Sequence, residues 1–325
     1  MGYLHSRPRL IASKRVRDRV QKEESPNNTK EQSVLKVSTY SALILAIFGI
    51  TFGSAVGSSA VVFDGFVALI SVGLGFLSVI TSRYIYKEDD DVFQYGYVRF
   101  EPMVNLFKSS VLIVVCVYAF ITGIGSIISG GYEIVLGGAM IYTFVALLYS
   151  FALSAYTRFY SKRLDSGLIK VDQTEWLIDC VLYGGSAITF GVIYLLDPRQ
   201  ENPYSHFLDP ALLTILSLFL SVSPIKIAIA NFKDLMMVAP KELDDKITEI
   251  METLSKEHQF GDYDTHVAKS GRFYTVEVNI LMDKNFQISS VAELDNLREY
   301  ICSALQIPSY KIWLSVSFTA DPKWL

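Results

Sequence analysis

The stretch Thr174-Glu175-Trp176-Leu177-Ile178-Asp179-Cys180 decides the fold, because it starts an apolar run that reaches Leu196. A helix that crosses a membrane needs about 20 apolar residues, and this run is long enough. Glu175 and Asp179 are one helical turn apart and project from one face of such a helix. A carboxylate at bilayer depth costs roughly 3 kcal/mol or more, so it usually faces a partner or a water-filled path. The stretch therefore predicts a membrane protein that handles something cationic.

The composition of the whole chain favours the same class of protein. Of its 325 residues, 51% are hydrophobic and 19% are charged, whereas a soluble globular protein is nearer ~25% charged. The mean hydropathy is +0.32. The formal net charge of -4 argues against a nucleic-acid surface, so we expect no nucleic-acid partner. The three cysteines form no CxxC pair, and we expect reduced or buried thiols.

Six apolar segments are long enough to cross a bilayer. They cover residues 37–56, 60–84, 102–128, 134–156, 173–196 and 210–230. Lysine and arginine gather in the N-terminal tail and in alternate loops, and the remaining loops are nearly neutral. By the positive-inside rule, this pattern places both termini in the cytoplasm. Pro224 falls inside the sixth segment, where we expect a kink.

The first 36 residues are polar and basic, and we expect a cytoplasmic tail here. The sequence Ser25-Pro26-Asn27-Asn28 predicts a break in any helix of the tail. Two interpretations stay open. Either the first part is an amphipathic helix on the anionic leaflet of the membrane, or the whole tail is disordered and only sets the topology.

After Pro240 the composition becomes that of a soluble domain. Helical spacing covers residues 241–256 and 290–305, and strand-like alternation covers 263–269, 272–282 and 311–318. Ser270-Gly271 is the expected hairpin turn. The order α-β-β-α-β predicts a ferredoxin-like α+β cytoplasmic domain, so the chain divides into a tail (1–36), a six-helix transmembrane domain (37–234) and this domain (235–325). About 85 residues bury only a small core, which favours dimerisation through the domain.

These features together resemble the cation diffusion facilitator family over about residues 37–320. The stretch Gly96-Tyr97-Val98-Arg99-Phe100-Glu101-Pro102 is similar to the family's Gly-His-Gly-Lys-x-Glu stretch before span three. Glu175-x-x-x-Asp179 stands where the family has His-x-x-x-Asp or Asp-x-x-x-Asp. Leu208-Asp209-Pro210 resembles the Asp-Pro start of its span six, and Ser270-Gly271 resembles the hairpin turn of its cytoplasmic domain. The resemblance depends on the order and spacing of these motifs rather than on any one of them.

The resemblance implies a transporter rather than an enzyme. It would be a homodimer that exports a divalent metal ion in exchange for protons, with one site per protomer between spans two and five and no organic cofactor. In a bacterium it would lie in the inner membrane. Two close carboxylates at low dielectric repel each other, so a proton neutralises the pair when no metal is bound, and a metal displaces that proton.

The second span departs from the family pattern. Val67 and Ser71 stand where the family has its two ligands, and the span's only carboxylate is Asp64. At ~1.5 Å per residue, Asp64 lies roughly 5–10 Å nearer the outer face than those ligand positions. It is either an outer ligand or exit relay, or a carboxylate satisfied by the first-turn amides of its helix. Ser71 is either a weak oxygen ligand or a packing residue.

Further candidate residues would line the transport path of the cation or form a contact between the two protomers of a dimer. Asn105 in the third span is a candidate for the path. Asp90 and Asp91, in an acidic loop after span two, either gather cations at the cytoplasmic mouth or are simply solvated. Arg99 and Asp234 are candidates for a charge pair across the dimer, and otherwise are two separate charges.

The family's accessory metal ligands are largely missing. Phe93 and Tyr97 stand where the family has loop histidines, and Ser315 and Ser317 occupy the last strand. The transport site would then bind the ion through oxygen, which favours Mn²⁺, Fe²⁺ or Mg²⁺, whereas Zn²⁺ accepts carboxylates but prefers sites with nitrogen or sulfur. The alternative function is that of a transport-deficient relative acting as a metal sensor or membrane scaffold. The sequence has no nucleotide-binding loop, no HExxH motif and no nucleophile–base pair, so we expect no enzyme.

Overall fold

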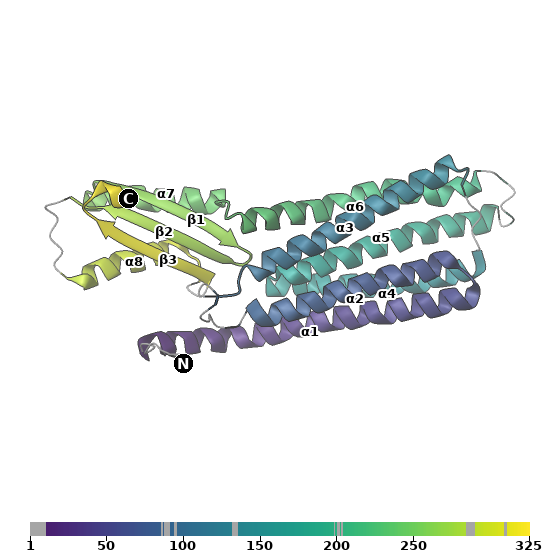
Figure 1. Cartoon of the computed structure of the whole chain (residues 1–325), viewed down its shortest axis with the longest axis horizontal. Coiled ribbons are helices and arrows are strands. Elements are labelled where there is room, and N and C mark those ends of the chain that lie inside the picture. Colours follow the sequence, from purple (N-terminus) through teal and green to yellow (C-terminus); the bar gives the residue numbers. More distant parts are fainter. Residues whose placement is uncertain are drawn as a thin grey trace, which may run out of the picture. The chain divides into compact units, whose positions relative to one another are not determined.

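The computed structural model describes residues 11–85, 87, 92–93, 96–131, 136–197, 199, 202, 204–283, 290–308 and 311–325, with the backbone alone for 11–27, 59 and 136. Within these residues, six helices are long and apolar enough to span a membrane. They are α1 (Ile11–Val56), α2 (Ser59–Ile85), α3 (Phe100–Ile128), α4 (Leu136–Leu164), α5 (Gly167–Leu196) and α6 (Ser205–Leu235) (Figure 1). The predicted six-helix membrane protein is confirmed.

The predicted break in the N-terminal tail is wrong. α1 runs without interruption through Ser25-Pro26-Asn27-Asn28, so much of the predicted tail is helix. Proline inside a helix removes a backbone hydrogen bond and costs about 3 kcal/mol. The helical residues on both sides outweigh that local cost here. α6 is also one element through Pro224, where the expected kink stays a prediction.

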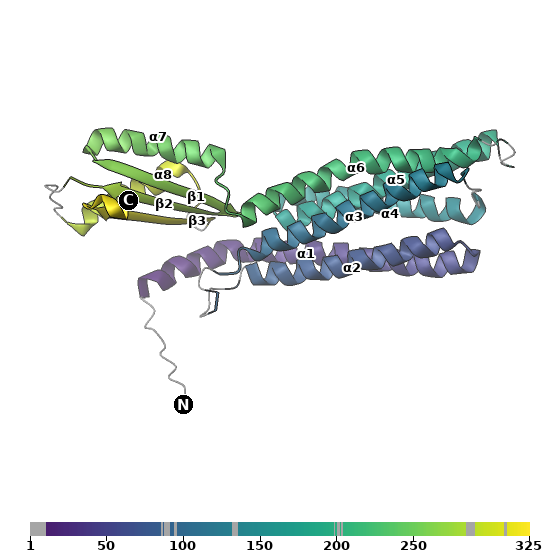
Figure 2. The same cartoon turned by 45° about the horizontal axis from the view of Figure 1, so that its top comes forward.

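Four helices, α1, α2, α4 and α5, form the main part of the first of two compact units, Met1–Lys87 with Ile124–Leu213. α1 pairs with α2 and α4 with α5, as Figures 1 and 2 both show, and α1 also contacts α4 and α5. α1 and α2 approach closely at Gly65, where an added Cβ would lie 2.6 Å from the backbone nitrogen of Ile50. Glycine is therefore needed at this contact.

The second unit, Glu88–Gly123 with Thr214–Leu325, contains most of α3 and α6 and the C-terminal domain. The domain consists of α7 (Lys241–His258), β1 (Asp262–Ser270), β2 (Phe273–Leu281), α8 (Val291–Leu305), β3 (Ile312–Thr319) and the short 3-10 helix η2 (Pro322–Trp324). The sheet order is β1-β2-β3, with β1 antiparallel and β3 parallel to β2. The predicted αββαβ order is confirmed, and the predicted domain limits stay a prediction.

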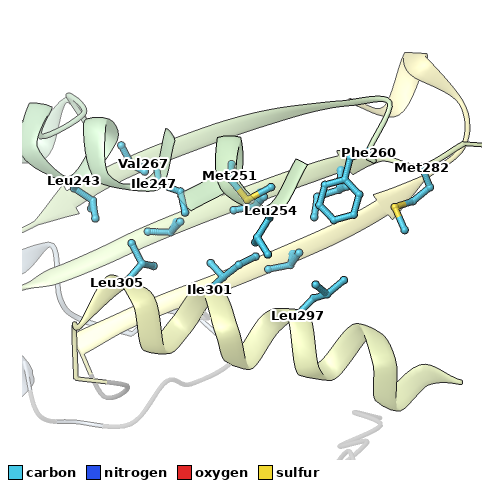
Figure 3. Close-up of a cluster of buried hydrophobic side chains, with 14 residues drawn as sticks. Leu243, Ile247, Met251, Leu254, Phe260, Val267, Met282, Leu297, Ile301 and Leu305 are labelled. Atoms are coloured by element: carbon cyan, nitrogen blue, oxygen red, sulfur yellow. The ribbon is translucent and has the colours of Figure 1, made fainter. Parts of the chain in front are cut away.

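One face of this sheet carries the core of the C-terminal domain. Val276, Val278 and Ile280 alternate along β2 and are fully buried. Figure 3 shows side chains of α7 and α8 that gather over this face. They are Leu243, Ile247, Met251, Leu254, Leu297, Ile301 and Leu305. Each buried leucine or isoleucine contributes about 1.5–3 kcal/mol, so both helices are held on the same face of the sheet.

The hairpin turn lies one residue later than the sequence predicted. Ser270 pairs with Phe273, so Gly271 and Arg272 form the turn. Gly271 has a φ of +60°, a left-handed conformation that glycine adopts without a steric penalty. Arg272 lies beside this glycine in the turn, outside the paired residues of β1 and β2.

The hairpin is attached to two of the long helices of its unit. Arg272 donates two hydrogen bonds of 2.9 Å to the carboxylate of Glu101 in the first turn of α3, and the two side chains are only 10% and 2% exposed. Asp234, in the last turn of α6, accepts a hydrogen bond of 3.2 Å from the amide of Gly271. The ammonium of Lys269 lies 3.6 Å from the same carboxylate.

Candidate cation site

α5 carries three carboxylates on one face. Asp172, Glu175 and Asp179 follow a spacing of three and four residues, which places them in one row along the helix. Asp172 and Glu175 are 2% and 9% exposed, and Asp179 is partly buried. Asp172 is absent from the sequence prediction, although its distance of three residues from Glu175 could have revealed it. The predicted acidic pair is therefore part of a row of three.

The row lines a cavity of about 40 Å³ inside the first unit. The walls of the cavity come from α1, α2 and α5. Their polar side chains are Ser38, Thr39, Asp64, Ser71, Asp172, Glu175, Asp179 and Tyr183. Each enclosed water needs at least roughly 10–15 Å³, so the cavity has room for one ion with a very small number of waters.

α2 places both of its predicted ligands, Asp64 and Ser71, in this cavity. Val67, which stands at a ligand position of the family, lines the same cavity. Asp64, Val67 and Ser71 all line it, together with Glu175 and Asp179. The aliphatic Val67 offers no donor atom. The structure thus brings the carboxylate of span two and those of span five to a common space, which the sequence spacing alone left open.

Asp64 is held by two tyrosines from other helices. Its Oδ2 accepts one hydrogen bond from the hydroxyl of Tyr142 on α4 and a second, of 2.5 Å, from the hydroxyl of Tyr183 on α5. The first-turn amide of Val61 donates instead to Ser58 Oγ, at 3.4 Å. Side chains of α4 and α5 therefore hold Asp64 Oδ2, and the role of Asp64 as an outer ligand or exit relay stays a prediction.

A further contact fixes α5 to α1 beside Glu175. The indole nitrogen of Trp176 donates a hydrogen bond of 2.8 Å to Ser38 Oγ, and both groups are buried. The ring of Tyr149 meets the indole edge to face at 6.3 Å. The position of the acidic row relative to α1 is set by this buried contact.

The donor set of the cavity is dominated by oxygen but is not gathered into a closed metal site. In the part of the chain that the structure describes, no three His, Cys, Asp or Glu side chains lie close enough together to hold a metal ion. The carboxylates are instead distributed along the cavity wall. Such oxygen donors suit hard divalent cations.

The remaining predicted residues lie elsewhere. Asn105 is on α3 in the second unit and is 2% exposed, and its place on a path stays a prediction. Asp90 and Asp91 fall outside the described residues. A guanidinium nitrogen of Arg99 lies 3.2 Å from the sulfur of Met237, and Asp234 contacts the hairpin. A pairing of Arg99 with Asp234 across a dimer stays a prediction.

Two serines and a histidine of the C-terminal domain can be placed on its sheet. Ser315 and Ser317 lie on β3 opposite Glu277 and Asn279 of β2. His266 is 3.7 Å from a carboxylate oxygen of Asp264. Neither His266 nor any other described histidine belongs to a cluster of three possible metal ligands.

These features define a multi-pass membrane protein with a carboxylate-lined cavity among its helices. The family model described as the cation efflux transmembrane domain matches residues 35–236, which is more than half of the chain. The chain therefore belongs to the cation efflux family of metal cation transporters, as the sequence predicted. Members of this family transport divalent metal cations as their substrates. A comparison with curated proteins finds no match.

Proposed function

We propose that this transporter exports a divalent cation from the cytoplasm in exchange for protons, and that Asp64, Glu175 and Asp179 bind the cation in turn as it moves along the cavity rather than as one closed three-carboxylate site. The cavity carries the proposal, because it joins carboxylates of α2 and α5 in one space within the first unit. Ser71 supplies a neutral oxygen to the same wall. Oxygen donors favour Mn²⁺, Fe²⁺ or Mg²⁺ over Zn²⁺, which binds more tightly where nitrogen or sulfur is present.

Proton exchange follows from the charge of the acidic row. Carboxylates that share a small cavity repel each other when all are ionised. Either a divalent cation or protons can relieve that repulsion, so the two kinds of ligand compete for Glu175 and Asp179. Competition of this kind is the physical basis of antiport, since cation and protons occupy the same site in turn.

The lysine and arginine residues in the tail and in alternate loops support cytoplasmic termini. This orientation ranks the carboxylates from the cytoplasmic side of the membrane to the outer side. Asp172, near the start of α5, then lies on the cytoplasmic side of Glu175. Asp64, near the start of α2, lies on the outer side. We assign to Asp172 the role of receiving the cation at the cytoplasmic end of the cavity. We also propose a homodimer, in keeping with the small C-terminal domain.

The test is metal-dependent proton flux into proteoliposomes that contain the purified protein. The variant Glu175→Gln with Asp179→Asn should abolish the flux and leave the size-exclusion profile unchanged. Asp165→Asn is the matched control, because Asp165 is exposed, lies just before α5 and has a positive φ of 47° that asparagine tolerates. Undiminished flux in the double variant would show that Glu175 and Asp179 do not form the transport site.

The same assay separates transport from the alternative function. A panel of Mn²⁺, Fe²⁺, Zn²⁺, Co²⁺ and Cd²⁺ should show flux for at least one ion, with Mn²⁺ or Fe²⁺ ahead of Zn²⁺. Flux for none of them would favour the metal sensor or membrane scaffold. Zn²⁺ as the best substrate would contradict the preference for hard ions.

A further inference from the structure

We propose that Tyr142 and Tyr183 are positioning residues, which hold Asp64 so that it presents a single oxygen to the transported cation. This inference rests on the proposed function of the cavity. Neither tyrosine is predicted from the sequence. Each belongs to a different helix from Asp64, and together they tie α4 and α5 to the carboxylate of α2.

Both hydroxyls donate to the same carboxylate oxygen. The Oδ2 atom of Asp64 accepts from Tyr142 and from Tyr183. A carboxylate oxygen has two lone-pair sites, so these two hydrogen bonds fill the capacity of Oδ2. The Oδ1 atom remains as the donor that Asp64 can offer to a cation in the cavity that it lines. Asp64 then binds through one oxygen and cannot chelate with both.

Aromatic packing fixes the two tyrosines. Tyr142 is 3% exposed and stacks on Phe48 and Phe52 of α1, with centroid distances of 5.5 Å and 6.5 Å. The ring of Tyr183 meets that of Tyr142 edge to face at 6.2 Å. Offset and edge-to-face pairs of this kind are favourable in buried sites. The hydroxyl positions, and with them the plane of the Asp64 carboxylate, are therefore set by packing from three helices.

The physical consequence is a preoriented ligand. Hydrogen-bond partners that orient a metal ligand typically change metal affinity or activity by 10- to 100-fold when they are removed. Loss of both hydroxyls would let the Asp64 carboxylate rotate and turn away from the cavity. The cation would then bind more weakly, although the carboxylates of α5 would be unchanged.

The test uses Tyr142→Phe, Tyr183→Phe and the double variant of the full chain. Mn²⁺-dependent proton flux should show an apparent KM about tenfold higher in the double variant, with a maximal rate within twofold of the native rate. The matched control is Tyr149→Phe, two turns further along α4, where the ring packs on Trp176 and no hydrogen bond of the hydroxyl is seen in the described residues. It should leave KM unchanged.

A second measurement isolates the role of Asp64. Mn²⁺ binding to the detergent-solubilised protein, followed by calorimetry, should weaken about tenfold in the double tyrosine variant. In an Asp64→Asn background, the same tyrosine changes should cause no further loss. A merely structural role of the tyrosines would weaken binding equally in both backgrounds.

Two outcomes overturn the positioning role. The first is an unchanged KM and Mn²⁺ affinity in a double variant that elutes as the native protein does. The second is an equal loss of affinity with and without Asp64. Either outcome counts against the positioning role alone if the native protein shows flux and the double variant Glu175→Gln with Asp179→Asn abolishes that flux. Absence of native flux instead contradicts the proposed function, so the two failures are distinguishable.

Discussion

The ion pair between Glu101 and Arg272 gives a sharp stability prediction. Arg272→Met removes the guanidinium and keeps an unbranched side chain about as long as the aliphatic stem of arginine. Glu101 is 2% exposed and loses two hydrogen bonds of 2.9 Å. Removing one partner of a buried ion pair typically costs 3–5 kcal/mol, because a buried charge loses its compensation. We expect a loss of about 3 kcal/mol, since Glu101 also makes other interactions.

The same hairpin offers a matched control. Lys269 lies 3.6 Å from Asp234, and these side chains are 37% and 15% exposed. A pair this open to solvent is screened and contributes about 0–1 kcal/mol. Lys269→Met should therefore have a much smaller effect than Arg272→Met, although both remove one positive charge from the same hairpin. Raising the salt concentration should weaken the Lys269 contact more than the Arg272 contact.

The assay is thermal unfolding of the full chain in detergent, read by the loss of the size-exclusion peak. The midpoint shifts by about 2–4 °C per kcal/mol for a chain of 150–250 residues, and by less for a longer one. For this chain of 325 residues, we expect Arg272→Met to lower the midpoint by about 4–6 °C and Lys269→Met by less than about 2 °C. A double-mutant cycle with Glu101→Gln should show coupling between Glu101 and Arg272. Equal shifts for the two methionine variants, or purely additive effects in the cycle, would refute the assignment of a buried, coupled pair.

Three further predictions follow from the structure. Asp64→Asn should reduce proteoliposome flux less than Asp179→Asn does, because Asp64 offers one oxygen. An equal loss of flux in the two variants would show that Asp64 is as important for transport as the α5 ligands. Asp172→Asn should lower flux and raise the apparent KM severalfold, since Asp172 is 2% exposed at the α5 wall of the cavity; an unchanged KM would exclude it from the path. Gly65→Ala should lower the unfolding midpoint by the equivalent of about 1–3 kcal/mol, because the added Cβ lies 2.6 Å from the backbone of α1. The control Gly73→Ala meets nothing within 4 Å and should not lower the midpoint, since alanine is favoured over glycine in a helix.

The features that could be predicted are those that local patterns in the sequence encode. Apolar length gave the six spanning helices, and alternation gave the order of strands and helices in the C-terminal domain. The spacing of Glu175 and Asp179 identified the acidic face of α5. Each of these signals is contained within one element, so no tertiary contact is needed to detect it.

The rest of the site depends on contacts between distant residues. Tyr142 and Tyr183 are 78 and 119 positions from Asp64, and no periodic pattern marks them. Asp172 lies outside the predicted fifth segment, 173–196, because the apolar pattern starts at residue 173. The helix α5 already begins at Gly167. The proline rule failed at Pro26 because it is local, and the long helix on either side determined the conformation.

The Gly271-Arg272 turn also limits the distance between two helix ends. Arg272 reaches the first turn of α3, and the amide of Gly271 reaches the last turn of α6. Two adjacent residues thus set how far apart these two helix ends can be within the second unit. One residue inserted between them would add about 3.3 Å of chain and could keep both contacts only by moving a helix end. The length of this turn therefore determines the distance between the ends of α3 and α6. A variant with a longer or shorter turn would have a different distance between them.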